Sequence, residues 1–170
     1  MRIMGIDPGY GIVGYGVVEY NRGKFTPVNA GTITTKSDME FFKRLRVIYL
    51  DMQQLIEHYR PDEIAVEKLY FNTNITTGID VAQARGVIML AAAQRDIPVF
   101  EYTPLQVKVA VTGYGRAEKR QMQEMTKNIL HLKEVPKPDD TADALAIAIC
   151  HGHTGGSKLS EIMRENKAHR

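Results

Sequence analysis

The sequence predicts an α/β fold with a mixed five-stranded sheet, three antiparallel strands plus two parallel, flanked by helices. Three observations favour it. Strand-like runs follow one another closely at the start of the chain, and helical and strand-like segments then alternate. The 170 residues suit one domain, and neither a repeat nor a low-complexity linker divides them.

The first three strands come from the N-terminal 35 residues. Met1–Asp7 is a short apolar run that Pro8-Gly9 stops, and the segments 10–20 and 24–35 are rich in β-forming residues. Asn21-Arg22-Gly23 supplies a turn between the second and third runs. Strand, turn and strand in such quick succession predict antiparallel pairing.

The pattern then changes to a helical period. Ser37-Asp38-Met39-Glu40 matches a capping box, in which Ser37 and Glu40 would each bond the other's backbone N–H. Pro61 ends the predicted helix. The apolar residues of this segment fall on one helical stripe: Phe41, Leu45, Ile48, Met52, Leu55 and Tyr59.

Two further strands alternate with helices. Glu63–Glu67 and 97–102 are strand-like, a helix is expected over about 78–95, and two or three helices follow to the end. The helix around Gly86 is apolar nearly all round, so two partners must cover it. One is the sheet, and the other is either a C-terminal helix or a second subunit.

Composition and charge narrow the class of protein. Nothing resembles an export signal or a membrane span, and the single cysteine, Cys150, fits a small buried hydrophobe. We therefore expect no membrane association and a reducing, cytoplasmic location. The segment 103–137 holds seven lysines and arginines against three glutamates. This excess indicates either a surface for a polyanion or a solvated helix face.

Four carboxylates stand where strand ends and a helix start would converge. Asp7 and Glu67 end strands, and Asp140 and Asp143 share one face of a helix start. Each has a structural explanation alone, as a turn residue, a strand end or a helix cap. Together they would repel one another, which hard divalent cations such as magnesium or manganese relieve.

Such a set of oxygen ligands suits phosphodiester hydrolysis by two metal ions. The histidines lack ligand spacing. His151 and His153 lie beyond the acidic helix start, where we expect them to interact with the helix C-terminus rather than bind metal.

Several motifs make the chain similar to the RuvC family of bacterial Holliday junction resolvases. They cover Met1 to about His153 and keep the family's order. The motifs are GIDPG at 5–9, GYGVV at 14–18, AVE at 65–67, QARGV at 83–87, PVFEYTPLQVK at 98–108, AEK at 117–119 and DDTADALAIAI at 139–149.

The resemblance implies a ribonuclease H-like nuclease domain over residues 1–155 and a basic tail over 156–170. It implies a crossover junction endonuclease that makes symmetric paired nicks in recombination and repair. Asp7, Glu67, Asp140 and Asp143 become the catalytic metal ligands, for two Mg²⁺ per subunit with Mn²⁺ as a substitute. Asp139 is the neighbour that could be mistaken for Asp140.

The resemblance also implies DNA contacts and partners. Lys108 and Lys119 match lysines near the scissile strand, and Tyr70 matches an aromatic that stacks on an unpaired base, although a core aromatic is the alternative. The QARGV segment resembles the family's dimer helix. Four-way junction DNA, a homodimer and the branch-migration proteins RuvA and RuvB are thereby implied. Tyr10 departs from the small residue many members have there.

Three other functions fit parts of the sequence. A nuclease of the same fold acting on RNA or an RNA–DNA hybrid is the main alternative. A junction-binding module without catalysis would lack one of the metal-binding residues, but all four carboxylates are present. An actin-like sugar or acetate kinase would need a second domain to close over ATP, for which 170 residues are too few.

Overall fold

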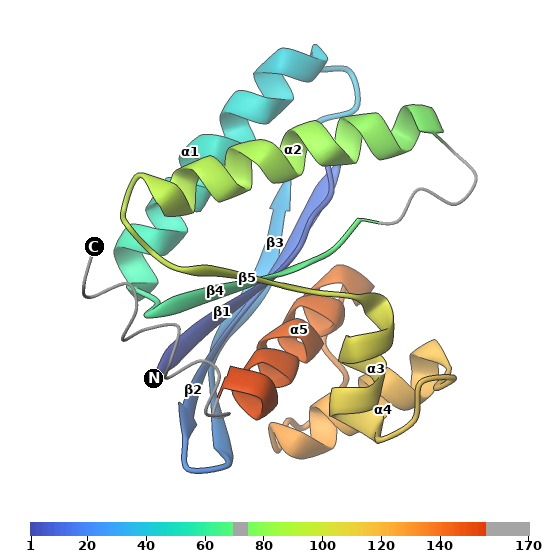
Figure 1. Cartoon of the computed structure of the whole chain (residues 1–170). Helices are drawn as coiled ribbons and strands as arrows, with labels where there is room; N and C mark the ends of the chain where they lie inside the picture. Colours follow the sequence, from blue (N-terminus) through green and yellow to red (C-terminus); the bar gives the residue numbers. More distant parts are fainter. Residues whose placement is uncertain (70–74, 156–170) are drawn as a thin grey trace.

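The computed structural model describes residues 1–69 and 75–155 (Figure 1), and the side chains of Ile75 and Thr76 are not described. Five strands and five helices follow one another in these residues. They are β1 (Arg2–Asp7), β2 (Ile12–Asn21), β3 (Lys24–Thr34), α1 (Phe41–Tyr59), β4 (Glu63–Glu67), α2 (Ile75–Ala93), β5 (Val99–Tyr102), α3 (Pro104–Thr112), α4 (Lys119–Ile129) and α5 (Asp139–Gly155).

One five-stranded sheet has the order β3-β2-β1-β4-β5. β1, β2 and β3 pair antiparallel, whereas β4 joins β1 and β5 joins β4 in parallel. β1 is therefore the central strand, and the expected mixed sheet is confirmed. The fifth strand begins at Val99 rather than at residue 97, and α2 starts three residues earlier than expected and ends at Ala93.

Helices cover both faces of the sheet (Figure 1), with α1 and α2 on one face and α5 on the other, where α3 and α4 pack around it. The alternation of side chains along the strands divides the core in two. Met4, Ile6, Ile64 and Val66 pack under α1 and α2, whereas Ile3 and its neighbours pack under α5.

The backbone of α5 lies directly on the sheet because glycines face it. A Cβ atom at Gly5 would stand 2.1 Å from the carbonyl oxygen of Ala144, and one at Gly14 only 2.0 Å from that of Asp140. Any side chain at either position would push the helix away. These two glycines, from the GIDPG and GYGVV motifs, thus set the depth at which the acidic helix start sits.

The predicted capping box before α1 is wrong. Ser37 lies in a turn, and the helix begins only at Phe41, with Glu40 at the N-cap and no side-chain cap hydrogen bond. The Thr35 N–H donates to the carbonyl of Gly11 and its hydroxyl to that of Tyr10. Because Thr35 is held there, the next residues are used to turn the chain rather than to cap the helix.

The two covers of α2 are the sheet and α1, since the C-terminal helix packs on the opposite face. Part of α2 still faces solvent: Ile79 is 50 % exposed and Leu90 49 %. No helix within the described ranges is long and apolar enough to cross a membrane. Cys150 is fully buried in the core under α5, as expected for a small hydrophobe.

Candidate active site

The sheet brings Asp7 and Glu67 side by side. Ile6 pairs with Val66 between the parallel strands β1 and β4, so the next residue of each strand is one of these acids. Glu67 also pairs with Tyr102 at the end of β5. Side chains one step beyond Ile6 and Val66 point to the opposite face, which is the face that α5 covers.

The first turn of α5 brings the remaining acids to the same edge. Asp143 is half-buried and faces the strand ends, and Asp140 is close enough to influence the charges of Asp7 and Asp143. Asp139 turns away toward α4, where its carboxylate accepts from Gln123 at 3.0 Å and pairs with Lys119 at 3.0 Å.

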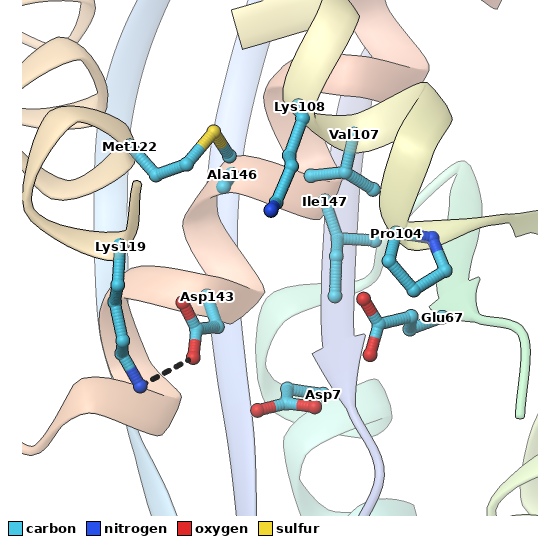
Figure 2. Close-up of a pocket in the computed structure, with 10 residues that line it drawn as sticks. All are labelled: Asp7, Glu67, Pro104, Val107, Lys108, Lys119, Met122, Asp143, Ala146 and Ile147. Carbon is cyan, nitrogen blue, oxygen red and sulfur yellow. Dashed lines mark ion pairs between the residues drawn. The ribbon is translucent and has the colours of Figure 1, made fainter. Parts of the chain in front are cut away.

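A pocket of about 290 Å³ lies between these elements (Figure 2). Figure 2 shows the carboxyl groups of Asp7, Glu67 and Asp143 around its lower part, with the Lys108 ammonium group approaching from above. Asp140 does not line it. The ten lining residues are Asp7, Glu67, Pro104, Val107, Lys108, Lys119, Met122, Asp143, Ala146 and Ile147.

The acids at this edge retain their protons more strongly than usual. Burial, followed by repulsion from Glu67, Asp143 and Asp140, raises the pKa of Asp7 to about 8. Burial also raises the pKa of Glu67 and of Asp143, and the neighbouring acids add to both effects. A bound divalent cation would relieve this repulsion and favour the ionised form of each acid, so the cluster is suited to binding one.

Lys119 partly offsets this charge. Its ammonium group lies 3.3 Å from Asp143 as well as 3.0 Å from Asp139, and Figure 2 shows the first of these ion pairs. The hydrogen bond to Asp139 is the largest cause of the raised pKa of Lys119. Lys119 lowers the pKa of Asp7 and Asp143, so it acts against the burial and the repulsion.

The donors fit a hard divalent ion in their chemistry. All are carboxylate oxygens, without cysteine or histidine in the pocket lining, and this is the set that magnesium and manganese prefer. In the residues that the structure describes, no three acidic, histidine or cysteine side chains already converge as a formed metal cluster. Asp143 is instead paired with Lys119, so binding an ion requires this contact to rearrange.

Comparison with known proteins identifies the family. The family model described as "Crossover junction endodeoxyribonuclease RuvC" matches residues 3–151. The chain belongs to the RuvC family. The RuvC of Brevibacillus brevis is 61 % identical over 151 residues, which cover 89 % of this chain and 91 % of that protein. The RuvC of Alkaliphilus metalliredigens is 56 % identical over 155 residues, covering 91 % and 94 %.

A solved structure agrees with this assignment. Thermus thermophilus RuvC, in complex with its Holliday junction substrate, superposes with a TM-score of 0.87 at 34 % identity, covering 91 % of this chain and 94 % of that one. The ribonuclease H-like fold expected from the RuvC resemblance is thereby confirmed. RuvC family membership also makes the protein a metal-dependent nuclease.

The structure brings most, but not all, of the predicted site residues into one pocket. Asp7, Glu67, Asp143, Lys108 and Lys119 share the pocket, and Asp140 stands beside it. Tyr70 and the tail 156–170 lie outside the described residues.

Other residues of the site were not foreseen. Pro104, Val107, Met122, Ala146 and Ile147 form its apolar walls. Pro104 and Val107 lie inside a motif quoted above, PVFEYTPLQVK, so the motif was the available signal. Ala146 and Ile147 likewise lie inside DDTADALAIAI, so Met122 is the one wall residue outside the quoted motifs.

Proposed function

We propose that this RuvC chain resolves Holliday junctions with a metal site made by Asp7, Glu67, Asp140 and Asp143. The observation that carries the proposal is the pocket that three of these acids line together with Lys108 and Lys119. Acids with raised pKa values beside two lysines suit a centre where cations and a phosphodiester meet.

Each residue has a distinct task in this proposal. Two Mg²⁺ ions, with Mn²⁺ as a substitute, would supply water activation and stabilisation of the leaving oxygen. Asp7 lines the pocket together with Glu67 and Asp143 (Figure 2), so these acids would hold the ions jointly. Lys108 and Lys119 would bind the phosphate and orient the strand. Tyr70 would stack on a base at the crossover, as the family resemblance implies.

We also propose that two copies act together through α2. Ile79, Gln83, Gly86, Leu90 and Ala93 are exposed and recur every three or four residues, so they form one stripe along α2. A Cβ atom at Gly86 would meet nothing within 4 Å, which leaves room for close approach of a second helix. A two-fold axis through this stripe would give two sites for two nicks of like polarity.

RuvA and RuvB would deliver the junction, again by family resemblance. We assign the nuclease domain to residues 1–155 and treat 156–170 as a separate basic tail.

Incubation with four substrates tests the proposed function. The purified protein is mixed with an immobile four-way junction, a linear duplex of the same sequence, an RNA–DNA hybrid and single strands, with Mg²⁺ or with EDTA. We expect paired nicks in the junction only, and only with Mg²⁺. Preferred cutting of the hybrid would contradict the junction assignment, and cutting in EDTA would contradict the metal site.

A further inference from the structure

A fully buried polar network lies under α5, at the end of the helix away from the active-site pocket. The Nε2 atom of His151 lies 2.5 Å from Oε2 of Glu63, and its Nδ1 atom lies 2.7 Å from the hydroxyl of Tyr102. His151 is 0 % exposed, Glu63 2 % and Tyr102 6 %. The expected interaction of His151 with the helix C-terminus is therefore not the main one it makes.

The hydrogen bonds of this network have a consistent direction in the His151 tautomer that carries its hydrogen on Nε2. Burial raises the pKa of Tyr102, so its hydroxyl keeps a proton and can donate it to Nδ1 of His151. The Nε2–H of His151 then donates to the Glu63 carboxylate. The ring of Phe100 packs against the imidazole of His151, with 4.7 Å between centroids and 39° between the ring planes. Buried polar groups this well paired fix one arrangement of the elements that carry them.

Those elements are the same ones that carry the active-site acids. Glu63 and Glu67 are the two ends of β4, and both point toward α5 because they alternate with Ile64 and Val66, which face α1 and α2. His151 and Asp143 lie on α5, two turns and a fraction apart. Tyr102 pairs with Glu67 across β4 and β5, and its carbonyl accepts from the N–H of Lys68.

The path from the network to the pocket along β4 is nearly as long as the path along α5. Four residues of strand from Glu63 to Glu67 span about 13 Å, and eight residues of helix from His151 to Asp143 span about 12 Å. A slide of α5 along β4 would move Asp143 relative to Glu67 and would strain the hydrogen bond between His151 and Glu63 at the same time. Packing of apolar side chains resists such a slide less sharply than a short hydrogen bond does.

We propose that Glu63, His151 and Tyr102 are positioning residues that set the separation between Asp143 and Glu67. The inference rests on the proposed function, in which these two acids hold the same ions. The network touches neither substrate nor metal. Its effect on the reaction is therefore to make the acids ready to bind ions without first shifting the helix.

Mn²⁺ titration by calorimetry on the full-length protein tests the inference, below the melting temperature of every variant. We expect Tyr102→Phe and His151→Leu to weaken Mn²⁺ binding at least about fivefold. Glu63→Gln, whose carboxamide oxygen still accepts from His151, should lose much less. Ile149→Ala is the matched control, because it leaves a cavity in the same buried helix but removes none of the hydrogen-bonding groups of the network. It should bind Mn²⁺ within about twofold of wild type.

The possible outcomes distinguish a failure of the positioning role from a failure of the proposed metal site. If Tyr102→Phe and His151→Leu melt earlier but bind Mn²⁺ as Ile149→Ala does, the network is only structural and the inference is overturned. If His151→Leu does not fold, Tyr102→Phe decides alone. If wild type shows no Mn²⁺ binding that Asp7→Asn removes, the proposed metal site fails and the inference falls with it.

Discussion

Lys119 of α4 forms an ion pair with Asp143 of α5, with 3.3 Å between Nζ and Oδ2. The ammonium group thus neutralises part of the charge of an acid that we assign to metal binding. Asp139 holds the same lysine from the other side at 3.0 Å. If Asp143 bound an ion, Lys119 would keep its ion pair with Asp139 and could bind a phosphate of the DNA.

Asp139 and Asp140 should differ sharply when each is changed to asparagine. Asp140→Asn should slow junction cleavage at least about 10²-fold, because it removes a proposed metal ligand beside Asp7 and Asp143. Asp139→Asn only weakens the hold on Lys119, so we expect less than about a tenfold loss. Single-turnover cleavage at saturating protein measures both. A greater loss for Asp139→Asn would reverse the assignment of the ligand.

Asp7→Asn should leave junction binding intact but slow cleavage by at least about 10³-fold, a rise in the barrier of roughly 4 kcal/mol. The reason is that Asp7 lines the pocket together with Glu67 and Asp143. Gel-shift assays in Ca²⁺ measure binding and single-turnover assays in Mg²⁺ measure cleavage. Near-normal cleavage by this variant would contradict the metal site.

The same substitution should stabilise the metal-free protein at high pH. The pKa of Asp7 is about 8 in the folded protein and near 3.8 when unfolded, so the folded state holds an extra proton between these values. Wild-type stability therefore falls as pH rises from about 4 to about 8, and asparagine removes this loss. Thermal melts in EDTA should show Asp7→Asn about 3 °C or more above wild type at pH 8, and less at pH 5.

Two outcomes decide this prediction. Adding Mg²⁺ at pH 8 should raise the melting temperature of wild type more than that of Asp7→Asn, since only wild type keeps the full set of acids. Equal melting differences at pH 5 and pH 8 would mean that Asp7 does not hold its proton in the folded state.

Gly14→Ala should damage stability and cleavage together. Its Cβ atom would stand 2.0 Å from the carbonyl oxygen of Asp140, so α5 must move. We expect a loss of about 1–3 kcal/mol in the free energy of unfolding, and slower cleavage because the acidic turn moves with the helix. Gly86→Ala, measured at a protein concentration where the chain is monomeric, is the control for stability, since its Cβ meets nothing within 4 Å in the single chain. Denaturant melts in which both variants behave alike would argue against the tight packing of α5.

Leu90→Glu should break the proposed dimer without unfolding the chain. Leu90 is 49 % exposed, so the charge is harmless in a single copy but would be buried between two. Sedimentation velocity should show the variant as a monomer at concentrations where wild type is a dimer. Paired nicks in one junction should become single nicks. A variant that remains dimeric would place the subunit contact elsewhere.

Much of the fold could be predicted because its signals are local. The apolar runs ending in Asp7 and Glu67 and the alternation of strands and helices gave the mixed sheet. Strand neighbours are not a local property of the sequence, so it is the structure that shows β1 and β4 to be adjacent. Ser37 misled because its pattern fits a cap, while the pairing of Thr35 with Gly11 depends on β2.

The candidate site also combines features with local sequence signals and features that depend on tertiary packing. Asp139 and Asp140 both have a spacing that places them on one helix face with Asp143. The packing of α4 beside α5 distinguishes them, because it brings Asp139 into contact with Lys119 and Gln123. His151 and Glu63 are 88 residues apart, so no spacing could join them. Their pairing arises from the way α5 crosses β4, which tertiary packing alone determines.

The central position of β1 in the sheet affects which parts of the domain open first by local unfolding. Its amides are paired on both sides, to β2 and to β4, and helices cover both faces. In deuterium exchange such a strand opens last, with the whole domain. We therefore expect the strand that carries Asp7 to be among the last to exchange, so that fraying of the edge strands leaves this acid in place.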